Sequence, residues 1–419
     1  MAGGNQDVER ICKMKILHTS DWHLGKRLNE RERIQEQVEV MDEIVRITEE
    51  ENVDVVVVAG DLFDTFNPSV EAIELLYRAL HRLANGGKRL VVAIAGNHDS
   101  PDRVDSPDVL ARQHGIFFVG SPKVHFNSTV TDGGIELSRS EEGISEFRLP
   151  GYEYPLRVMH TPYANSLRLC RFLGVEEQEE GLRAVLREHW GALAAKYCDN
   201  AGVNLLVTHL YVAREGGDMP EEPEDERPIN IGGADAVYTS LIPDGIQYAA
   251  LGHLHRWQVV DTVPCPAVYS GSPLGYSFSE AGQDKYVTLV EAEPGQEVRF
   301  EKRRLTSGRP LVRVRFEGVE QAVAWLAGHP EAWVELTVAT DTYLTAAETK
   351  SIHEAHDGIV CLIPEVKEAS VSDERVASIH DLRSDVNALF AEYFRRRKGQ
   401  EPNDEIMALF RETLSIEDL

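Results

Sequence analysis

The sequence predicts an α/β fold for most of the chain. Over residues 1–260, short apolar runs rich in β-branched residues alternate with stretches whose apolar residues recur every three or four positions. The apolar runs are bounded by Gly, Asp or Asn, as buried strands commonly are. Strands that alternate with amphipathic helices are typical of α/β domains.

The individual elements can be placed from these patterns. The strands expected in the first part of the chain cover 16–17, 53–59, 90–95, 205–208 and 246–251. The amphipathic helices expected between them cover 33–50, 69–84 and 178–198. From residue 306 onward the pattern predicts a small α+β unit, with strands near 312–316, 334–338 and 359–363 and helices near 319–327 and 345–355.

The chain therefore divides into four predicted parts. They are a flexible extension at 1–13, a main α/β domain at 14–305, the small α+β domain at 306–375 and a pair of helices at 376–419. Aromatic and aliphatic residues line one stripe of the final helices, among them Phe390 and Phe394. Such a stripe can pack on the protein's own body or bind a partner.

Composition excludes several classes of protein. The chain has 419 residues with 70 acidic and 43 basic side chains, so its formal net charge is -27. This balance argues against a protein that holds nucleic acid by a generally basic surface, but it leaves a local binding groove open. Five cysteines without a CxxC pair predict a reduced, cytoplasmic protein, and the absence of a long apolar run argues against a membrane span.

Side chains that bind metals follow each of the five predicted strands. Because the carboxyl ends of strands in α/β sheets gather functional groups, these residues are expected to meet. The set comprises Asp21, His23, Asp61, Asn97, His209, His253 and His255. Carboxylates, an amide and imidazoles suit Mn, Fe or Zn, and the set is too large for one ion. Two divalent ions about 3.5–4 Å apart would use all of these ligands and would clamp a phosphoryl centre.

The order of these motifs resembles that of the calcineurin-like metallophosphoesterases. DxH, GDxxD, GNHD, a lone His after a strand and GHxH follow one another along the chain. The surrounding residues at 15–25, 59–65, 95–100 and 269–274 resemble the SbcD family of bacterial nuclease subunits more specifically. The resemblance is strong over 14–305 and weaker to the end of the chain.

The resemblance implies a fold and a role for each site residue. The expected fold is a four-layer α/β/β/α sandwich, with 306–375 as a capping domain. One ion, usually manganese in this family, would be bound by Asp21, His23, Asp61 and His255. The second would be bound by Asp61, Asn97, His209 and His253. His98 would stabilise or protonate the leaving oxygen as a general acid, and the Asp64 carboxylate would orient His98.

The resemblance also implies an activity and partners. It implies hydrolysis of phosphodiester bonds in DNA, as a 3′→5′ exonuclease on double strands and an endonuclease on single strands or hairpins. The helices at 376–419 would bind an SMC-like ATPase of the SbcC type, and a homodimer through the nuclease domain would complete a heterotetramer. Since the chain has no GxxxxGK[ST] motif, any ATP dependence would come from that partner.

Two other functions remain open from the sequence. One is a phosphatase or nucleotide phosphodiesterase of the same fold, which the long extension after residue 306 disfavours. The other is a scaffold with a decayed site, which the complete ligand set disfavours. Several residues also keep two interpretations each, as site residues or as ordinary packing, turn or surface residues: His18, Trp22, Lys26, Arg27, Asp99, Arg256 and the acidic stretch 215–226.

Overall fold

The computed structural model describes residues 13–163, 179–221 and 236–366, together with positions 390, 394, 406, 407 and 410. No helix among these residues is long and apolar enough to span a bilayer. The predicted extension, apart from Lys13, and most of the predicted C-terminal helices lie outside the described residues.

One sheet of six strands lies at the centre of the main domain, in the order β16-β15-β1-β2-β3-β4. Strands β1 to β4 are parallel, and β15 and β16 are antiparallel additions at one edge. The bounds are β1 Met14–Thr19, β2 Val55–Ala59, β3 Leu90–Ile94, β4 Ile116–Val119, β15 Lys285–Ala292 and β16 Arg299–Leu305. Every residue of β2 and β3 is buried, which agrees with a parallel sheet that is covered on both faces.

A second sheet of eight strands packs against the first, in the order β13-β14-β12-β9-β8-β7-β6-β5. Its strands β8, β9, β12 and β14 are parallel, and the strands at both edges are antiparallel. The bounds are β5 Thr129–Val130, β6 Glu136–Glu141, β7 Ile144–Arg148, β8 Leu156–Thr161, β9 Val203–Thr208, β12 Tyr248–Leu251, β13 Gln258–Asp261 and β14 Ala267–Tyr269. A small pair, β10 (Val212–Ala213) and β11 (Val237–Tyr238), lies beside it.

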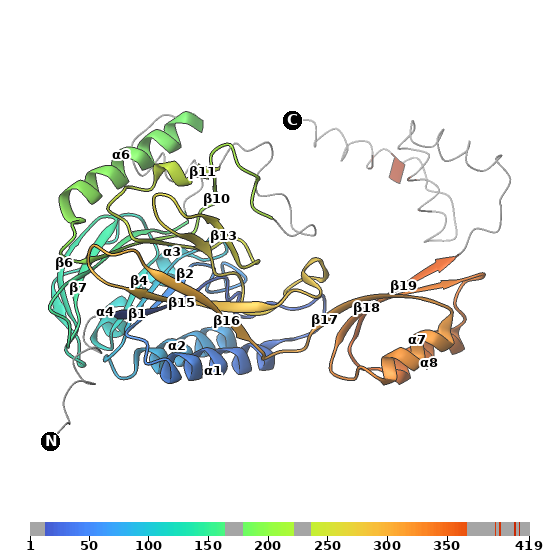
Figure 1. Cartoon of the computed structure of the whole chain (residues 1–419). Coiled ribbons are helices and arrows are strands. Elements are labelled where there is room, and N and C mark those ends of the chain that lie inside the picture. The colour runs from blue at the N-terminus through green and yellow to red at the C-terminus, as the bar shows by residue number, and fades with distance from the viewer. Residues whose placement is uncertain are drawn as a thin grey trace, which may run out of the picture.

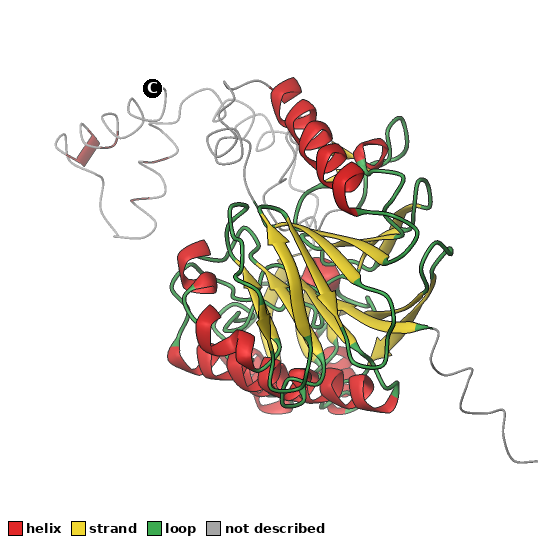
Figure 2. Cartoon of the chain, turned by 90° about the vertical axis from the view of Figure 1, so that its left-hand side faces the viewer, coloured by secondary structure: helices red, strands yellow, loops and turns green. Residues whose placement is uncertain are grey.

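Helices cover the outer faces of both sheets (Figures 1 and 2). The first sheet is covered by α1 (Ile34–Glu50) and α2 (Val70–Ala84), and α6 (Glu179–Tyr197) lies over the second. Short helices α3 (Pro101–Asp105) and α4 (Asp108–Gln113) connect β3 to β4. Three apolar clusters fill the layers: one between α1, α2 and the first sheet, one between the two sheets, and one between the second sheet and α6. The expected four-layer α/β/β/α sandwich is confirmed.

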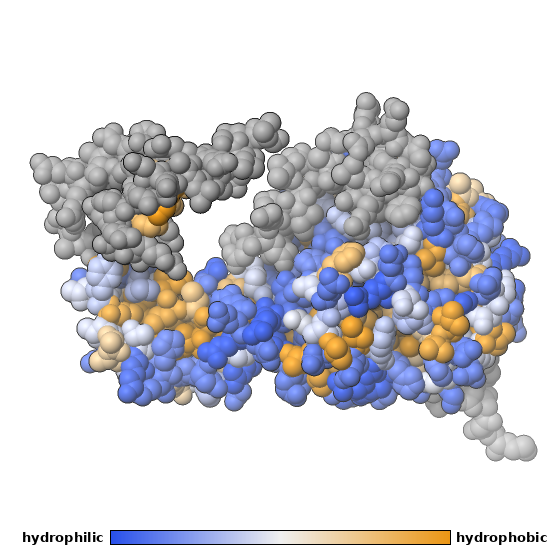
Figure 3. All heavy atoms as spheres, turned by 180° about the vertical axis from the view of Figure 1, so that it is seen from behind, coloured by the Kyte–Doolittle hydropathy of each residue, from blue (hydrophilic) through white to orange (hydrophobic). Residues whose placement is uncertain are grey.

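The small domain alternates strands and helices: β17 (Leu311–Glu317), α7 (Val319–Ala327), β18 (Trp333–Thr340), α8 (Ala346–Ala355) and β19 (Ile359–Val366). Its three strands are parallel and are joined by helices, so this part of the chain is a small α/β unit and not the α+β unit expected from the sequence. Both helices share one apolar cluster with the sheet, although Val312, Val314 and Phe316 in it are only partly buried. Seen from behind, this domain shows an area of hydrophobic residues (Figure 3).

Two carboxylates on α1 fasten the small domain to the main one. Glu43 accepts hydrogen bonds from the backbone N–H groups of Thr306 (2.9 Å) and Ser307 (2.8 Å) in the connecting segment. Glu36 accepts one from the indole of Trp333 at 2.9 Å. Trp333 also packs in a separate apolar cluster with residues of the main domain, Leu28 and Phe278. The position of the small domain is therefore set by specific contacts and not only by the chain connection.

Candidate metal centre

The structure brings the seven predicted metal ligands together. They follow β1, β2 and β3 of the first sheet and β9 and β12 of the second, and the carboxyl ends of these strands meet between the two sheets. Nitrogen and oxygen atoms of Asp21, His23 and His255 lie within 4.8 Å of one another, and so do those of Asp21, Asp61 and His209. All five of these side chains are buried. Neighbouring strand ends from two sheets thus form one buried polar cluster.

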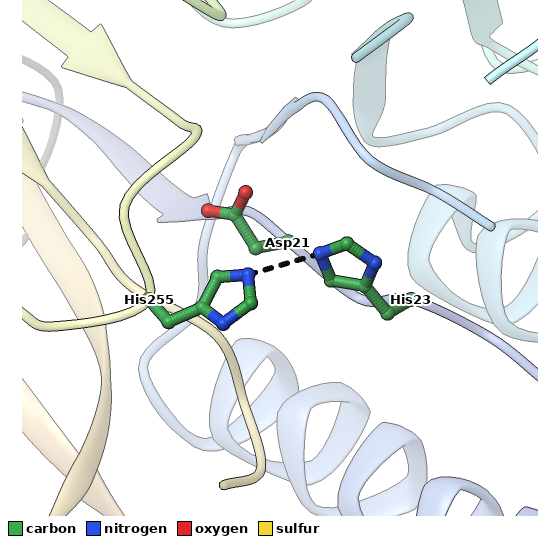
Figure 4. A group of neighbouring side chains, drawn as sticks. All are labelled: Asp21, His23 and His255. Atoms are coloured by element: carbon green, nitrogen blue, oxygen red, sulfur yellow. Dashed lines mark hydrogen bonds between the residues drawn. The ribbon is translucent and has the colours of Figure 1, made fainter. Parts of the chain in front are cut away.

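The first group of ligands is built around two imidazoles (Figure 4). The Nε2 atoms of His23 and His255 are 3.0 Å apart and face each other beside Asp21. His23 Nε2 also lies 3.5 Å from Asp61 Oδ2. Asp21, His23 and His255 thus form one group, which Asp61 contacts through His23, and the binding of one ion by these four side chains stays a prediction.

The second group of ligands surrounds the amide oxygen of Asn97. His209 Nε2 lies 3.0 Å from Asn97 Oδ1, and His253 Nδ1 lies 2.9 Å from it. His209 Nε2 is 3.3 Å from Asp61 Oδ2, the same oxygen that faces His23 in the first group. Asp61 therefore lies between the two groups, in the place of a bridging carboxylate.

The backbone is strained at four of these residues. Positive φ angles occur at Asp21 (52°), His23 (43°), Asp61 (49°) and His253 (111°). Within the described part of the chain, seven non-glycine residues adopt positive φ, so this site holds most of them. Such conformations cost about 1–3 kcal/mol each and concentrate at functional sites, where the surrounding structure imposes them. The strain indicates that side-chain placement, and not local backbone preference, determines these turns.

Motif glycines leave space for the ligands. A Cβ added at Gly60 would lie 2.2 Å from His209 Nδ1, and one added at Gly96 would lie 2.1 Å from Asp61 Oδ1. An added methyl group at either position would overlap a ligand side chain. The Gly residues of GDxxD and GNHD are thus required by close approach.

Replacing Gly96 by alanine should displace Asp61 and weaken Mn²⁺ binding by at least about tenfold, because a loss of only about 1.4 kcal/mol of binding free energy changes the binding constant tenfold. Calorimetric titration with Mn²⁺ measures this. Gly191→Ala is the matched control, since a Cβ there meets no atom within 4 Å and the residue lies within α6. Equal Mn²⁺ affinities for the two variants would contradict the packing argument.

His98 is less buried than the other imidazoles of the cluster. Its backbone N–H donates to Asp61 Oδ1 at 2.8 Å, and its Nδ1 lies 2.7 Å from the backbone carbonyl oxygen of Asp64. The prediction that the Asp64 carboxylate orients His98 needs correction, because the backbone carbonyl makes this contact. The carboxylate instead lies 3.0 Å from Lys26 Nζ and 3.6 Å from His23 Nδ1.

Geometry alone also allows a different role for His98. A ligand atom of His98 lies within 4.8 Å of ligand atoms of His23 and Asp61, so the side chain is close enough to bind an ion. The resemblance implies a general acid at this position and not a ligand. The two roles predict different consequences of removing the imidazole, since only loss of a ligand would also remove an ion.

Electrostatics favour a cation at this point. Burial alone would raise the pKa of Asp61, but His209 and His23 outweigh it and hold that pKa well below its ordinary value. Although burial opposes it, Asp61 in turn raises the pKa of His209 to about 9. Burial lowers the pKa of His23 to about 4 and that of His253 to about 3, which keeps both rings neutral. A divalent cation would take the place of the proton that Asp61 and His209 share.

Two carboxylates support the cluster without being predicted as part of it. Asp99, left open by the sequence, accepts hydrogen bonds from the N–H groups of Leu62 (3.0 Å), Phe63 (2.9 Å) and Gly96 (2.8 Å) and so ties two ligand loops together. Glu280 lies 3.4 Å from His255 Nδ1 and was not predicted at all. It follows the last of the named matching segments, 269–274, by six residues, and no spacing rule indicated it.

The remaining open residues have local roles in the structure. His18 is fully buried with its Nδ1 3.0 Å from the Tyr248 hydroxyl, and the buried Trp22 donates to Thr19 Oγ1 at 3.0 Å, so both pack beneath the site. The basic residues beside the motifs are paired with acids: Lys26 with Asp64, Arg27 with Glu32, and Arg256 with Glu221 of the acidic stretch.

Comparison with known proteins agrees with this geometry. The calcineurin-like phosphoesterase family matches residues 14–257. The SbcD subunit of the nuclease SbcCD from Bacillus subtilis is 36% identical over 409 residues, which cover 96% of this chain and 98% of the relative. The chain belongs to the SbcD family. The Rhodobacter capsulatus SbcD protein is 35% identical over 67% of each chain.

A second family model matches the C-terminal part of the chain. Residues 307–398 match a family described as the type 5 capsule protein repressor C-terminal domain, which covers the small domain and part of the tail. A dimetal phosphatase from Danio rerio aligns with 69% of this chain and 98% of its own at 13% identity and a TM-score of 0.37. As a member of the SbcD family and of the calcineurin-like phosphoesterases, the chain is a metal-dependent phosphodiesterase.

Proposed function

We propose that this SbcD-family chain is a DNA nuclease that uses two divalent ions, most simply Mn²⁺, in processing DNA ends for repair. It would act as a 3′→5′ exonuclease on double strands and as an endonuclease on single strands and hairpins. One observation carries the proposal: two ligand groups share Asp61, and His98 lies directly beside them. Two ions in such an arrangement would lower the pKa of a water molecule and stabilise the charge that develops on a phosphoryl group.

The residues present fit this pair of ions. Both groups combine carboxylate oxygens with imidazole nitrogens, and Asn97 adds an amide oxygen, a donor set suited to Mn²⁺. His23 Nε2 and His255 Nε2 lie 3.0 Å apart, so both nitrogens would face the same ion once it is bound. Burying these polar nitrogen atoms costs free energy, which binding of a metal ion would offset.

His98 can work as the general acid. The Asp64 carbonyl oxygen can only accept, so His98 Nδ1 carries a hydrogen, and Nε2 is the nitrogen left for proton transfer. Protonated at both nitrogens, the ring would give its Nε2 proton to the departing sugar oxygen while Asp64 fixes its orientation. The contact of its backbone N–H with Asp61 Oδ1 keeps the ring beside the bridging carboxylate.

A cleavage assay tests this function. With Mn²⁺, the chain should nick or degrade a hairpin oligonucleotide and shorten a labelled duplex from its 3′ end, and EDTA should stop both reactions. Cleavage of p-nitrophenyl phosphate alone would support the phosphatase alternative. Failure to cleave either substrate, with no Mn²⁺ bound, would support a decayed scaffold.

We also propose that two copies dimerise through the nuclease domain. Five large apolar side chains are exposed on α2, on the segment just before it and on α4: Phe66, Val70, Tyr77, Val109 and Leu110. Leu110 is 73% exposed and Val109 is 68% exposed, which is unfavourable for a surface left in water. Both helices contact β4, so the segments lie on one part of the domain.

Replacing Leu110 by glutamate should convert the dimer into a monomer, because a charge buried in an apolar interface without a partner costs several kcal/mol. Light scattering after size exclusion measures the mass. Val263→Glu is a matched control, since Val263 is 70% exposed and lies between β13 and β14 of the other sheet. A Leu110→Glu variant that stays dimeric would exclude this surface.

We assign residues 14–305 to the nuclease domain, 306–375 to a capping domain and 376–419 to helices that bind an SMC-like ATPase of the SbcC type, in a cytoplasmic heterotetramer. The relatives are named as one subunit of the nuclease SbcCD, which supports a two-component assembly. In the tail, the rings of Phe390 and Phe410 stack with centroids 4.0 Å apart, which supports a paired arrangement of its helices.

Deletion of 376–419 should abolish binding of the ATPase, with at least about a hundredfold loss of affinity, because removal of a helical anchor eliminates its buried apolar contacts. Cleavage of the hairpin by the isolated SbcD-family chain should remain. A pull-down with the purified ATPase and a parallel nuclease assay measure both. Retained ATPase binding would show that the partner contacts a different part of the chain.

A further inference from the structure

The buried carboxylate of Glu280 lies behind one of the candidate metal ligands. Glu280 ends a short 3₁₀ turn, Phe278–Glu280, and is 3% exposed. Its Oε1 lies 3.4 Å from Nδ1 of His255, whose Nε2 faces His23 on the other side of the ring. The two nitrogens of one imidazole thus face two different partners, the ligand cluster and Glu280.

The carboxylate is itself held firmly. The backbone N–H of Tyr276 donates to Oε1 at 2.9 Å, and the Lys285 ammonium forms an ion pair with Oε2. Lys285 also donates to the backbone oxygen of His255 at 3.0 Å and to Ser272 Oγ at 2.9 Å. Lys285 therefore links the Glu280 carboxylate to the backbone of His255.

A carboxylate in this place determines the tautomer of the imidazole. Because a carboxylate can only accept a hydrogen bond, His255 Nδ1 must carry the hydrogen, and the lone pair is then on Nε2. Hydrogen bonding of this kind also makes the other nitrogen a stronger donor to a cation. A purely structural ion pair would do neither of these things for a neighbouring ring.

We propose that Glu280 is a positioning residue, which fixes the orientation and tautomer of His255 so that its Nε2 can bind the first ion. The inference rests on the proposed function in taking His255 as a metal ligand. It adds to that function a residue outside all five ligand motifs. The effect reaches the ion only through His255.

The second ligand group gives a comparison within the same site. His209 Nδ1 lies 2.8 Å from the backbone carbonyl oxygen of Ala59, a neutral acceptor that fixes the same tautomer without a charge. Loss of Glu280 should therefore weaken one of the two bound ions and leave the other nearly unchanged. A general loss of folding would affect both ions alike.

The experiment compares three variants of the full chain. Glu280→Gln removes the charge at constant size, and Glu280→Asp keeps a charge near Lys285 but withdraws it from His255. Glu146→Gln is the control: Glu146 is also buried and also paired with a basic side chain, that of Arg157, at 2.8 Å, but it lies on β7, between β6 and β8 and outside the ligand groups. Electron paramagnetic resonance of free Mn²⁺ measures the affinity of each variant for the ions. The melting temperature of each variant is measured once in EDTA and once in Mn²⁺.

We expect wild type and Glu146→Gln to bind two Mn²⁺ ions with the same pair of affinities, although Glu146→Gln should melt earlier in EDTA. Glu280→Gln should bind one ion normally and the other about 10- to 100-fold more weakly, the usual effect of losing such a supporting group. Its gain in melting temperature on addition of Mn²⁺ should shrink accordingly. Glu280→Asp should weaken the same ion, and it provides the measurement if Glu280→Gln does not fold.

Three other results would distinguish failure of the positioning role from failure of the proposed function and from a general loss of stability. Unchanged affinities for both ions in the folded Glu280 variants would overturn the positioning role, while the proposed function would stand. If wild type binds no Mn²⁺ and does not cleave DNA, the proposed function fails first, and the positioning role fails with it. Equal weakening of both ions, with the same change in Glu146→Gln, would show that Glu280 acts only on stability.

Discussion

Replacement of Asp61 by asparagine should remove Mn²⁺-dependent DNA cleavage almost completely, by at least about a thousandfold, because metal ions contribute several kcal/mol to a phosphoryl transition state and each 1.4 kcal/mol is a factor of about ten. Asp61 Oδ2 lies 3.5 Å from His23 Nε2 and 3.3 Å from His209 Nε2, so one oxygen serves both ligand groups. Asparagine has the same shape but carries no charge. Both ions should therefore be affected, in contrast to a change at His255 or Asn97.

The measurement is Mn²⁺ titration together with cleavage of the hairpin. Asp105→Asn is the control, since Asp105 is a partly buried carboxyl whose pKa is raised to about 6 by burial, and it accepts a hydrogen bond from the backbone N–H of Gly120 outside the ligand groups. The control should bind two ions and cleave normally. An Asp61→Asn chain that still binds two ions with wild-type affinity would show that Asp61 does not bridge them.

Replacement of His98 by alanine should slow cleavage by about 10²- to 10⁴-fold, the range that general acids contribute, while binding of two Mn²⁺ ions remains. The side chain is in contact with the Asp64 carbonyl oxygen at 2.7 Å and has a nitrogen free for proton transfer. The loss should be smaller for a substrate whose leaving group needs no proton, such as a p-nitrophenyl phosphodiester. That difference between leaving groups is the signature of a general acid.

His114→Ala is the control for this variant, because His114 is an exposed imidazole that pairs with Asp132, at 3.6 Å, and lies outside the cluster. It should cleave both substrates at the wild-type rate. If His98→Ala loses one of the two ions, then His98 is a ligand, as its closeness to His23 and Asp61 also allows. An equal loss for both substrates with two ions bound would argue for a role in substrate binding.

The ligand set could be predicted from sequence because each member directly follows a buried strand. Asp21, Asp61 and Asn97 come two or three residues after strands that are apolar over most of their length, and such strands belong to a covered parallel sheet. The alternation of strands with helices predicted the α/β class for the same reason. The pairing of strands into two sheets comes from the family resemblance, since periodicity does not show which strands are neighbours.

The supporting residues could not be predicted from the pattern. Glu280 reaches His255 across 25 residues of chain, and a contact of that kind depends on tertiary packing. Asp99 belongs to the GNHD motif, but the sequence does not show that it accepts hydrogen bonds from three backbone N–H groups in two loops. The role of Asp64 was assigned to its side chain, whereas a backbone carbonyl, which every residue has, makes the contact with His98.

The net charge of -27 also has a different meaning once the fold is known. It argues against binding of DNA by a generally basic surface, but two divalent cations would add positive charge where a phosphate arrives. Arg256, next to the last ligand, pairs with Glu221 of the acidic stretch, so its charge is already neutralised within the chain. We therefore expect local attraction of DNA to depend mainly on the bound ions.

Anomalous X-ray diffraction from crystals soaked in Mn²⁺ can locate the bound ions. We expect two peaks about 3.5–4 Å apart on either side of the Asp61 carboxylate. One should be in contact with Asp21, His23 and His255, and the other with Asn97, His209 and His253. A single peak, or peaks that do not share Asp61, would contradict the two-ion site on which the proposed nuclease mechanism depends.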